Sequence, residues 1–137
     1  MLTIRKKFTF ASAHKLNNPD FNEEWNKEKY GKCCELHGHS WTLFVEVRGY
    51  GLEEDELVAS GMIINFVDLK EIVNNAVIVY LDHHYINDLV DFPPTCENLI
   101  IWIRHRLDLF LSDKMIALVS LELFESEGSS AIWRRND

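Results

Sequence analysis

Hydrophobic and polar residues alternate along four segments of the chain, and a period of two is typical of β-strands. The first segment runs from Leu2 to Ala13 and the second from Ser40 to Tyr50. The third covers Ala117 to Glu125, and a short fourth segment, Ala131 to Arg134, follows a turn at 127–130. The sequence therefore predicts two pairs of strands, one near each end of the chain.

Between these two pairs, the hydrophobic positions recur at helical offsets. One helix is predicted from Phe66 to Tyr80. Thr95 is a good N-cap for a second helix that reaches Phe110, and Glu97 would lie in its first turn, where a negative charge suits the helix dipole. The element order ββααββ predicts an α+β fold, with two helices on one face of a four-stranded antiparallel sheet.

Two further segments are polar and are predicted to be loops. Asn17 to Lys32 has room for one short helical turn over Glu23 to Glu28. Leu52 to Ser60 is acidic and is expected to be solvated. A loop as long as the first one is often functional in a small domain.

Composition and charge restrict what the protein binds. A chain of 137 residues has the length of one domain, here residues 1–137. With 22 acidic and 14 basic residues, its formal net charge is −8, which argues against nucleic acid and anionic membranes as partners. The predicted sheet would expose its outer strands, so we expect further copies of the chain to pair with them in a homo-oligomer.

The cysteines and the first residues bear on localisation. Three Cys, of which Cys33 and Cys34 are adjacent, do not form a disulfide framework, so reduced thiols in the cytoplasm are expected. Basic residues at 5–7 interrupt any early apolar run, so no secretory signal is expected. The apolar stretches are too short to span a bilayer, which needs about 18 residues or more.

Three histidines are candidate metal ligands. His37 and His39 lead into the second predicted strand, and a period of two places both imidazoles on one face. His14 ends the first strand with the parity of Phe8 and Phe10, and an antiparallel neighbour would bring it to the same place. Three His without an evident fourth ligand describe a catalytic zinc site with an open position. The alternative is three unrelated surface histidines.

Other reactive side chains have more than one interpretation. Cys33 and Cys34 precede the His pair, and a thiol there could be a base, a nucleophile, a fourth zinc ligand or an inert buried group. Asp82 could orient His83, or both could simply end a helix. Glu125 could accept two hydrogen bonds from an amino-heterocycle, or emerge into solvent.

Several short motifs occur in order along nearly the whole chain. They are Phe10–Leu16, Cys33–His39, Gly61–Phe66, Asp68–Lys70, Leu81–Asn87, Pro94–Leu99 and Glu125. Together they resemble the 6-pyruvoyl-tetrahydropterin synthase and 6-carboxytetrahydropterin synthase superfamily. The resemblance implies a T-fold in which trimers close a barrel and two trimers stack into a hexamer, with active sites at subunit interfaces.

The resemblance also implies roles for individual residues. The Zn²⁺ ligands would be His14, His37 and His39, and the substrate would be 7,8-dihydroneopterin triphosphate. The catalytic residues would be Cys33 as the thiol and Asp82 with His83 as the proton relay, and the pterin pocket would be formed by Glu125, Thr95 and Glu97. Asn65 stands where the family usually has Asp, and candidates for the triphosphate are Lys15, Lys32 and Arg104.

Two subclasses share these motifs. The short spacing from Cys33 to His37 resembles the carboxy-type lyase of queuosine biosynthesis, which releases 6-carboxy-5,6,7,8-tetrahydropterin, acetaldehyde and triphosphate. The long Asn17–Lys32 loop looks more like the pyruvoyl type, which eliminates triphosphate from the same substrate. The carboxy-type activity is the favoured prediction. A non-catalytic pterin- or zinc-binding oligomer is less consistent with the intact Cys, Asp and His set.

Overall fold

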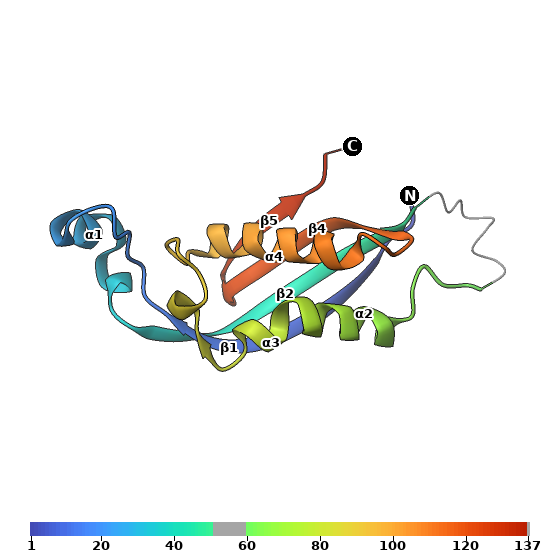
Figure 1. Cartoon of the computed structure of the whole chain (residues 1–137), viewed down its shortest axis with the longest axis horizontal. Coiled ribbons are helices and arrows are strands. Elements are labelled where there is room, and N and C mark those ends of the chain that lie inside the picture. Colours follow the sequence, from blue (N-terminus) through green and yellow to red (C-terminus); the bar gives the residue numbers. More distant parts are fainter. Residues whose placement is uncertain (51–59, 137) are drawn as a thin grey trace.

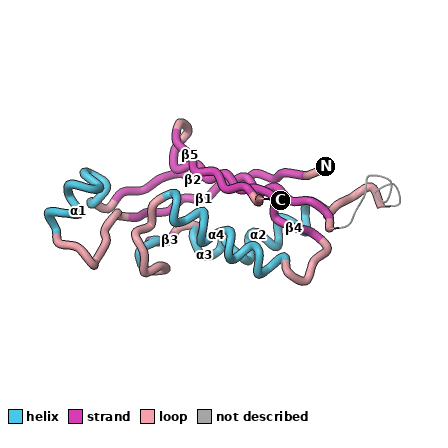
Figure 2. The backbone as a smooth tube through the Cα atoms, turned by 90° about the horizontal axis from the view of Figure 1, so that it is seen from above, coloured by secondary structure: helices cyan, strands magenta, loops and turns pink. Residues whose placement is uncertain are grey.

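A β-sheet with helices packed on one face forms the body of the protein (Figures 1 and 2). The computed structural model describes residues 1–50 and 60–136. The acidic loop predicted at Leu52 to Ser60 lies, apart from Ser60, outside the described residues. In Figure 2 the helical segments at 66–81 and 96–111 lie below the sheet, and no helix of the described chain covers its other face.

The sheet contains the four predicted strands and one that the sequence pattern missed. The strands are β1 (Ile4–His14), β2 (His37–Gly49), β3 (His84–Tyr85), β4 (Ile116–Ser126) and β5 (Ser129–Arg134), in the spatial order β3-β1-β2-β4-β5. β1, β2, β4 and β5 pair antiparallel, as predicted. β3 pairs in parallel with Ser12 and Ala13 of β1. The sheet therefore has one very short strand more than the four predicted. A strand of two residues is too short to show an alternating pattern in the sequence.

Alternation along β1 and β2 decides which side chains face the helices. In β1, Phe8, Phe10 and His14 are buried, and residues between them are mostly exposed. In the central strand β2, Trp41 and Leu43 are fully buried. Because directly paired residues point to the same face, the pairing of Phe10 with Trp41 continues the core up to the histidine end of both strands.

Two helical segments cover the sheet, as predicted. The first consists of α2 (Phe66–Val73), a π-helical stretch (Asn74–Ile78) and α3 (Val79–Leu81), and the second is α4 (Cys96–Leu111). Each has the N-cap that its sequence favours: Asn65 Oδ1 accepts a hydrogen bond from Val67 N at 2.9 Å, and Thr95 Oγ1 accepts one from Asn98 N at 3.1 Å. Asn65 therefore caps its helix as well as the Asp usual at this position would.

The π-helical stretch is held by an arginine from the other helix. Arg106 Nε donates to Ala76 O at 2.5 Å, and its guanidinium lies over the rings of Tyr80 (4.3 Å to the centroid) and Trp102 (5.1 Å). A π-helical turn inserts a residue and frees a carbonyl from the regular ladder, and such turns often occur near functional sites. Here the Arg106 contact ties the first helical segment to α4 shortly before α3 ends.

The long polar segment after β1 is folded rather than a loop with a single helical turn. It contains α1 (Glu23–Tyr30) and a 3₁₀ turn (Gly31–Cys34), and it lies beyond the ends of β1 and β2 (Figure 1). Asn26 is 3% exposed and donates through Nδ2 to Asn18 O, Phe21 O and Asn22 O, and its Oδ1 accepts from Asn18 N. This amide network and the stacking of Phe21 on Trp25 at 4.0 Å hold the segment together.

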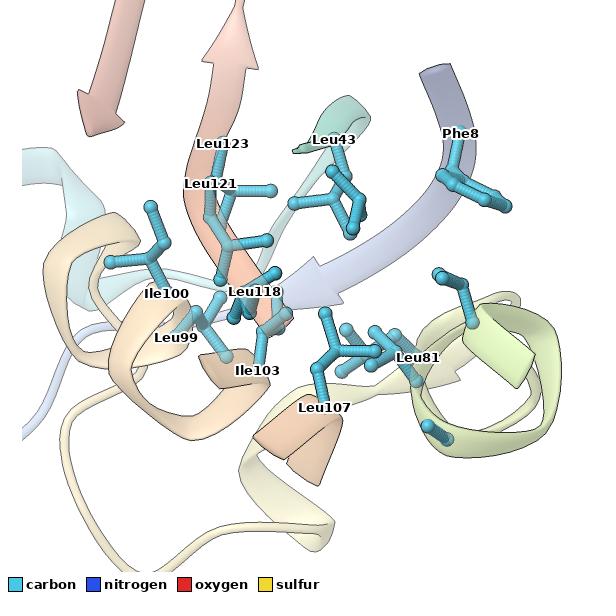
Figure 3. Close-up of a cluster of buried hydrophobic side chains, with 14 of the residues drawn as sticks. Phe8, Leu43, Leu81, Leu99, Ile100, Ile103, Leu107, Leu118, Leu121 and Leu123 are labelled. Carbon is cyan, nitrogen blue, oxygen red and sulfur yellow. The ribbon is translucent and has the colours of Figure 1, made fainter. Parts of the chain in front are cut away.

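Leucine and isoleucine side chains fill the space between the helices and the sheet (Figure 3). Leu43 from β2 and Leu121 from β4 point toward Ile103 and Leu107 of α4 and Leu81 at the end of α3, and all five are fully buried. The end of α3 is therefore part of the same core as the central strands.

No helix of the described chain is long and apolar enough to cross a membrane.

Truncating the core at its centre tests this packing. We expect Leu43→Ala to lower the free energy of unfolding by about 3 kcal/mol, because it leaves a cavity between β2 and α4. Leu109→Ala on the same helical layer is the control, since Leu109 is 69% exposed and should change stability by less than about 0.5 kcal/mol. Urea unfolding followed by circular dichroism measures both, and equal effects of the two variants would contradict the packing described.

Candidate metal centre

The three predicted histidine ligands meet at the joined ends of β1 and β2. The candidate ligand atoms of His14, His37 and His39 all lie within 4.8 Å of one another. Their ring centroids are 4.5 Å apart for His14 and His37, 5.1 Å for His14 and His39, and 4.9 Å for His37 and His39. The β1–β2 register pairs His14 with His37, so the cluster follows directly from the strand pairing.

Backbone carbonyls orient two of the imidazoles. His14 Nδ1 donates to Pro94 O at 2.8 Å, and His37 Nδ1 donates to Glu35 O at 2.7 Å. Because a carbonyl oxygen can only accept, Nδ1 carries the proton in both rings. In a neutral ring this leaves Nε2 with a free lone pair, the tautomer that a metal ligand needs.

Burial keeps His14 in its neutral form. Desolvation lowers the pKa of His14 to about 4, an effect that the Pro94 hydrogen bond opposes and the neighbouring His37 and His39 reinforce. His14 is fully buried, whereas His37 and His39 are half-buried at the mouth of the cluster. His14 therefore offers its lone pair at neutral pH without first losing a proton.

The centre of the cluster fits a divalent cation. The Nε2 atoms of His14 and His39 are buried and have no hydrogen-bond partner, which is costly for a polar atom. Glu125 Oε1 faces the same place, 3.5 Å from His14 Nε2 and 3.6 Å from His39 Nε2. Three converging imidazoles form a donor set that zinc binds with one position left open. A bound cation would satisfy both unpaired nitrogens.

A tryptophan forms the apolar floor beneath the histidines. Trp41 is fully buried, and its ring packs edge-on against His14 at 5.3 Å and against His39 at 5.4 Å. Phe10 stacks on the other side of Trp41 at 5.9 Å. An apolar wall of this kind limits the motion of the imidazoles and excludes water from below them.

The three thiols have different environments. Cys33 is exposed, and its carbonyl accepts a hydrogen bond from Leu16 N at 2.7 Å, which ties its 3₁₀ turn to the end of β1. Cys34 is half-buried and its Sγ donates to Asn26 O at 3.1 Å. Cys96 is buried, and burial raises its pKa to about 11. Among the described residues, the group of converging ligand atoms contains no sulfur, so a closed structural zinc site is not favoured.

Asp82 and His83 form a close pair, although adjacent residues in regular structure do not face each other. His83 Nδ1 lies 2.9 Å from Asp82 Oδ2, and His83 adopts a φ of 60°, which turns its ring back toward Asp82. A hydrogen bond from Ala11 N–H, followed by that from His83, lowers the pKa of Asp82. His83 is exposed and lines a surface hollow together with backbone and side-chain atoms of β1 and β2, including those of His39.

The remaining predicted site residues are Thr95, Glu97, Glu125 and the triphosphate candidates. Thr95 is half-buried, with its hydroxyl engaged in the helix cap, and Glu97 is exposed in the first turn of α4. Glu125 lies next to the histidines, as described above. Of the triphosphate candidates, Arg104 is paired with Asp108 at 3.3 Å and lies over Trp133 at 5.1 Å, and both contacts hold it along α4.

Sequence reasoning missed the groups that orient the site. The carbonyl of Pro94 orients His14, and Ser12 contacts the end of α3. A backbone carbonyl carries no signature in the side-chain sequence, so the Pro94 contact had no detectable signal. Ser12 did have one, because it is a polar residue on the buried parity of β1.

Comparison with known proteins identifies the family. The profile of the family described as 6-pyruvoyl tetrahydropterin synthase matches residues 3–136, so the chain belongs to this family. It is 33% identical over 135 residues to 6-pyruvoyl tetrahydrobiopterin synthase of Dictyostelium discoideum, covering 96% of this chain and 94% of that protein. It is also 33% identical over 132 residues to 6-carboxy-5,6,7,8-tetrahydropterin synthase of Synechocystis, covering 96% and 92%.

The solved structures confirm the predicted fold class. The structure of 6-pyruvoyl tetrahydropterin synthase from Caenorhabditis elegans matches with a TM-score of 0.84 at 24% identity, over 98% of this chain and 96% of that one. The protein thus has the T-fold that its motifs predicted.

Metal content tests the histidine cluster. We expect the purified protein to retain about one zinc ion per chain after dialysis, because three imidazoles converge on one point. His39→Ala should lose most of this zinc, since it removes one of the two unpaired buried nitrogens. His105→Ala, which removes an exposed imidazole on α4, should keep it. Mass spectrometry of the metal gives the result, and full zinc content in His39→Ala would show that the cluster is not the site.

Proposed function

We propose that the protein is a zinc-dependent lyase that converts 7,8-dihydroneopterin triphosphate to 6-carboxy-5,6,7,8-tetrahydropterin, acetaldehyde and triphosphate. The main support is the convergence of His14, His37 and His39 at one end of the sheet. Asp82 and His83 form a close pair, and His83 lines a surface hollow together with His39. Family membership supports a lyase that acts on a pterin, and the site residues are consistent with the proposed reaction type.

The residues of this chain would divide the chemistry among them. His14, His37 and His39 would hold a zinc ion, which when bound polarises hydroxyl and carbonyl oxygens and acidifies neighbouring C–H bonds. Cys33, as the thiolate, would accept a proton from a side-chain carbon of the substrate.

The remaining groups would handle protons and bind the ring. His83, oriented by Asp82, would return a proton to the pterin ring or side chain, since its exposed face is open to a bound substrate. Glu125 would accept two hydrogen bonds from the amino-pterin. Thr95 and Glu97 at the start of α4 would line the same pocket.

Both candidate reactions balance without an external reductant. Proton transfer from the side chain to the ring reduces the dihydropterin ring while it oxidises the side chain. In the carboxy-type reaction, one water is consumed, the side chain is cleaved in retro-aldol fashion to release acetaldehyde, and triphosphate leaves. In the pyruvoyl-type reaction, triphosphate is eliminated and the carbon skeleton stays intact. The two outcomes differ in a volatile product that is easily measured.

The carboxy-type outcome rests on the spacing between Cys33 and His37. The pyruvoyl type is the second candidate, because the segment at 17–32 is long and contains the helix α1. Relatives with either name are equally similar to this chain, at 33% identity. A binding protein without activity is less consistent with an exposed Cys33 and with the close pairing of Asp82 and His83.

The assembly and location belong to the same proposal. We propose a homo-oligomer, a hexamer built as a dimer of trimers, that acts in the cytoplasm in queuosine biosynthesis. Within the described residues, the Ile4–Phe10 stretch of β1 pairs with another strand on one side only, and β5 is the other outer strand of the sheet. Edges of this kind favour pairing between copies of the chain.

Product analysis decides between the candidate functions. We expect incubation with 7,8-dihydroneopterin triphosphate to release acetaldehyde and triphosphate in equal amounts, with 6-carboxy-5,6,7,8-tetrahydropterin as the pterin product. Coupled alcohol dehydrogenase measures acetaldehyde, and mass spectrometry identifies the pterin. Triphosphate release without acetaldehyde would assign the pyruvoyl type instead. Substrate binding with no product would support the binding protein.

The two adjacent thiols provide a matched pair of variants. We expect Cys33→Ala to keep its zinc but to lose turnover by about 100-fold or more, because the accessible thiol transfers the proton. Cys34→Ala should keep turnover within about threefold. Because the Cys34 Sγ donates to Asn26 O, its removal should mainly lower the free energy of unfolding. Metal content and steady-state rates separate the two roles. Loss of zinc in Cys33→Ala would make this residue a ligand, and an inactive Cys34→Ala would exchange the two assignments.

A further inference from the structure

Ser12 occupies a special position in β1. It is paired on one side with His39 of β2 and on the other with His84 of β3, so it lies between the metal cluster and the segment that carries the Asp82–His83 pair. Its side chain is 6% exposed. A buried hydroxyl needs a hydrogen-bond partner.

The partner of Ser12 is the last carbonyl of a helix. Ser12 Oγ donates to Leu81 O, and Leu81 is the final residue of α3. The next residue, Asp82, has an extended backbone with a ψ of 125°, so the chain leaves the helix here. Carbonyls in the last turn of a helix have no partner within that helix. The Ser12 hydroxyl therefore caps α3 from the neighbouring strand.

The preceding residue of β1, Ala11, binds Asp82 and His83, the two residues that follow Leu81. Ala11 N donates to Asp82 Oδ1 at 3.0 Å, and Ala11 O accepts from His83 N at 2.6 Å. His83 has a positive φ, a conformation that is uncommon for a residue other than glycine and that persists only where surrounding contacts hold it. Contacts from Ala11 and Ser12 thus hold three successive residues, Leu81 to His83.

We propose that Ser12 is a positioning residue for the Asp82–His83 pair. Its hydroxyl fixes the end of α3 against β1, so Asp82 and His83 keep a constant position relative to this strand. The proposal rests on the proposed function, in which His83 transfers a proton. Without this hydroxyl, Leu81 O would be left buried and unpaired, and the chain at 81–83 would move to reach another donor or water.

Turnover of Ser12→Ala is the first test. We expect kcat to fall about 10- to 100-fold with KM within about twofold, because a misplacement of about 1 Å has an effect of this size. Zinc content should stay unchanged. The matched control is Ser112→Ala, since Ser112 Oγ also donates to a helix-end carbonyl, Leu109 O at 2.8 Å, away from the described site. Ser12→Cys has nearly the same size but a weak donor, and should lose activity like Ser12→Ala while keeping the fold.

A double-mutant cycle separates positioning from general damage. If Ser12 acts through His83, then adding Ser12→Ala to His83→Ala should cause little further loss of kcat, less than about twofold. If Ser12 merely supports the fold, Ser12→Ala should lower kcat by the same factor in both backgrounds. Equal factors would overturn the proposal.

Amide hydrogen exchange tests the proposal without any substrate. The His83 amide is bonded to Ala11 O, and we expect Ser12→Ala to speed its exchange about tenfold or more, whereas Ser112→Ala should leave it unchanged. If the wild-type protein gives no product from 7,8-dihydroneopterin triphosphate, the proposed function fails, but this measurement still reports on Ser12. Unchanged exchange at His83 in Ser12→Ala would overturn the positioning role.

Discussion

β1 and β2 pair with His14 opposite His37, and the position of the metal centre depends on this register. The side-chain period of a strand is two, so a slip by one residue would move one set of imidazoles to the opposite face. The same slip would expose Trp41 and Leu43, which are both fully buried in the core. Burial of these two side chains therefore holds the register, and the register holds the histidines. In this part of the protein, the β1–β2 register determines both the packing of the core and the geometry of the site.

The buried surroundings of the imidazoles leave their Nε2 atoms free to bind a cation. The same surroundings lower the stability of the folded state when these nitrogens have no partner. Burial lowers the pKa of His14 to about 4, and the Pro94 carbonyl leaves its Nε2 unprotonated and pointing inward. Without a cation, the Nε2 atoms of His14 and His39 lack a hydrogen-bond partner. Such groups lower the stability of the folded state, and a bound cation would restore it, so cation binding at this site would be coupled to folding.

Local patterns predicted those features that depend on residues near one another in sequence. Alternation located four strands, Thr95 marked the start of α4, and the parity of His14 with the His37 and His39 pair indicated the cluster. The features that were missed depend on contacts between distant residues. β3 forms because His84 and Tyr85 pair with β1, and the helix α1 is held largely by the buried amide of Asn26. Neither contact leaves a periodic signal in the chain.

β1 contacts three of the groups that carry a proposed role. His14 ends β1, Ala11 and Ser12 hold the segment with Asp82 and His83, and Leu16 just beyond the strand bonds to Cys33 O. The Cys33 thiol and the His83 imidazole are both exposed, so neither is fixed by packing around its own side chain. Their separation from the metal cluster is instead set by backbone contacts to β1. A strand that is hydrogen-bonded on both sides at Ser12 and Ala13 is stiff enough for this purpose, because its ladder resists local displacement.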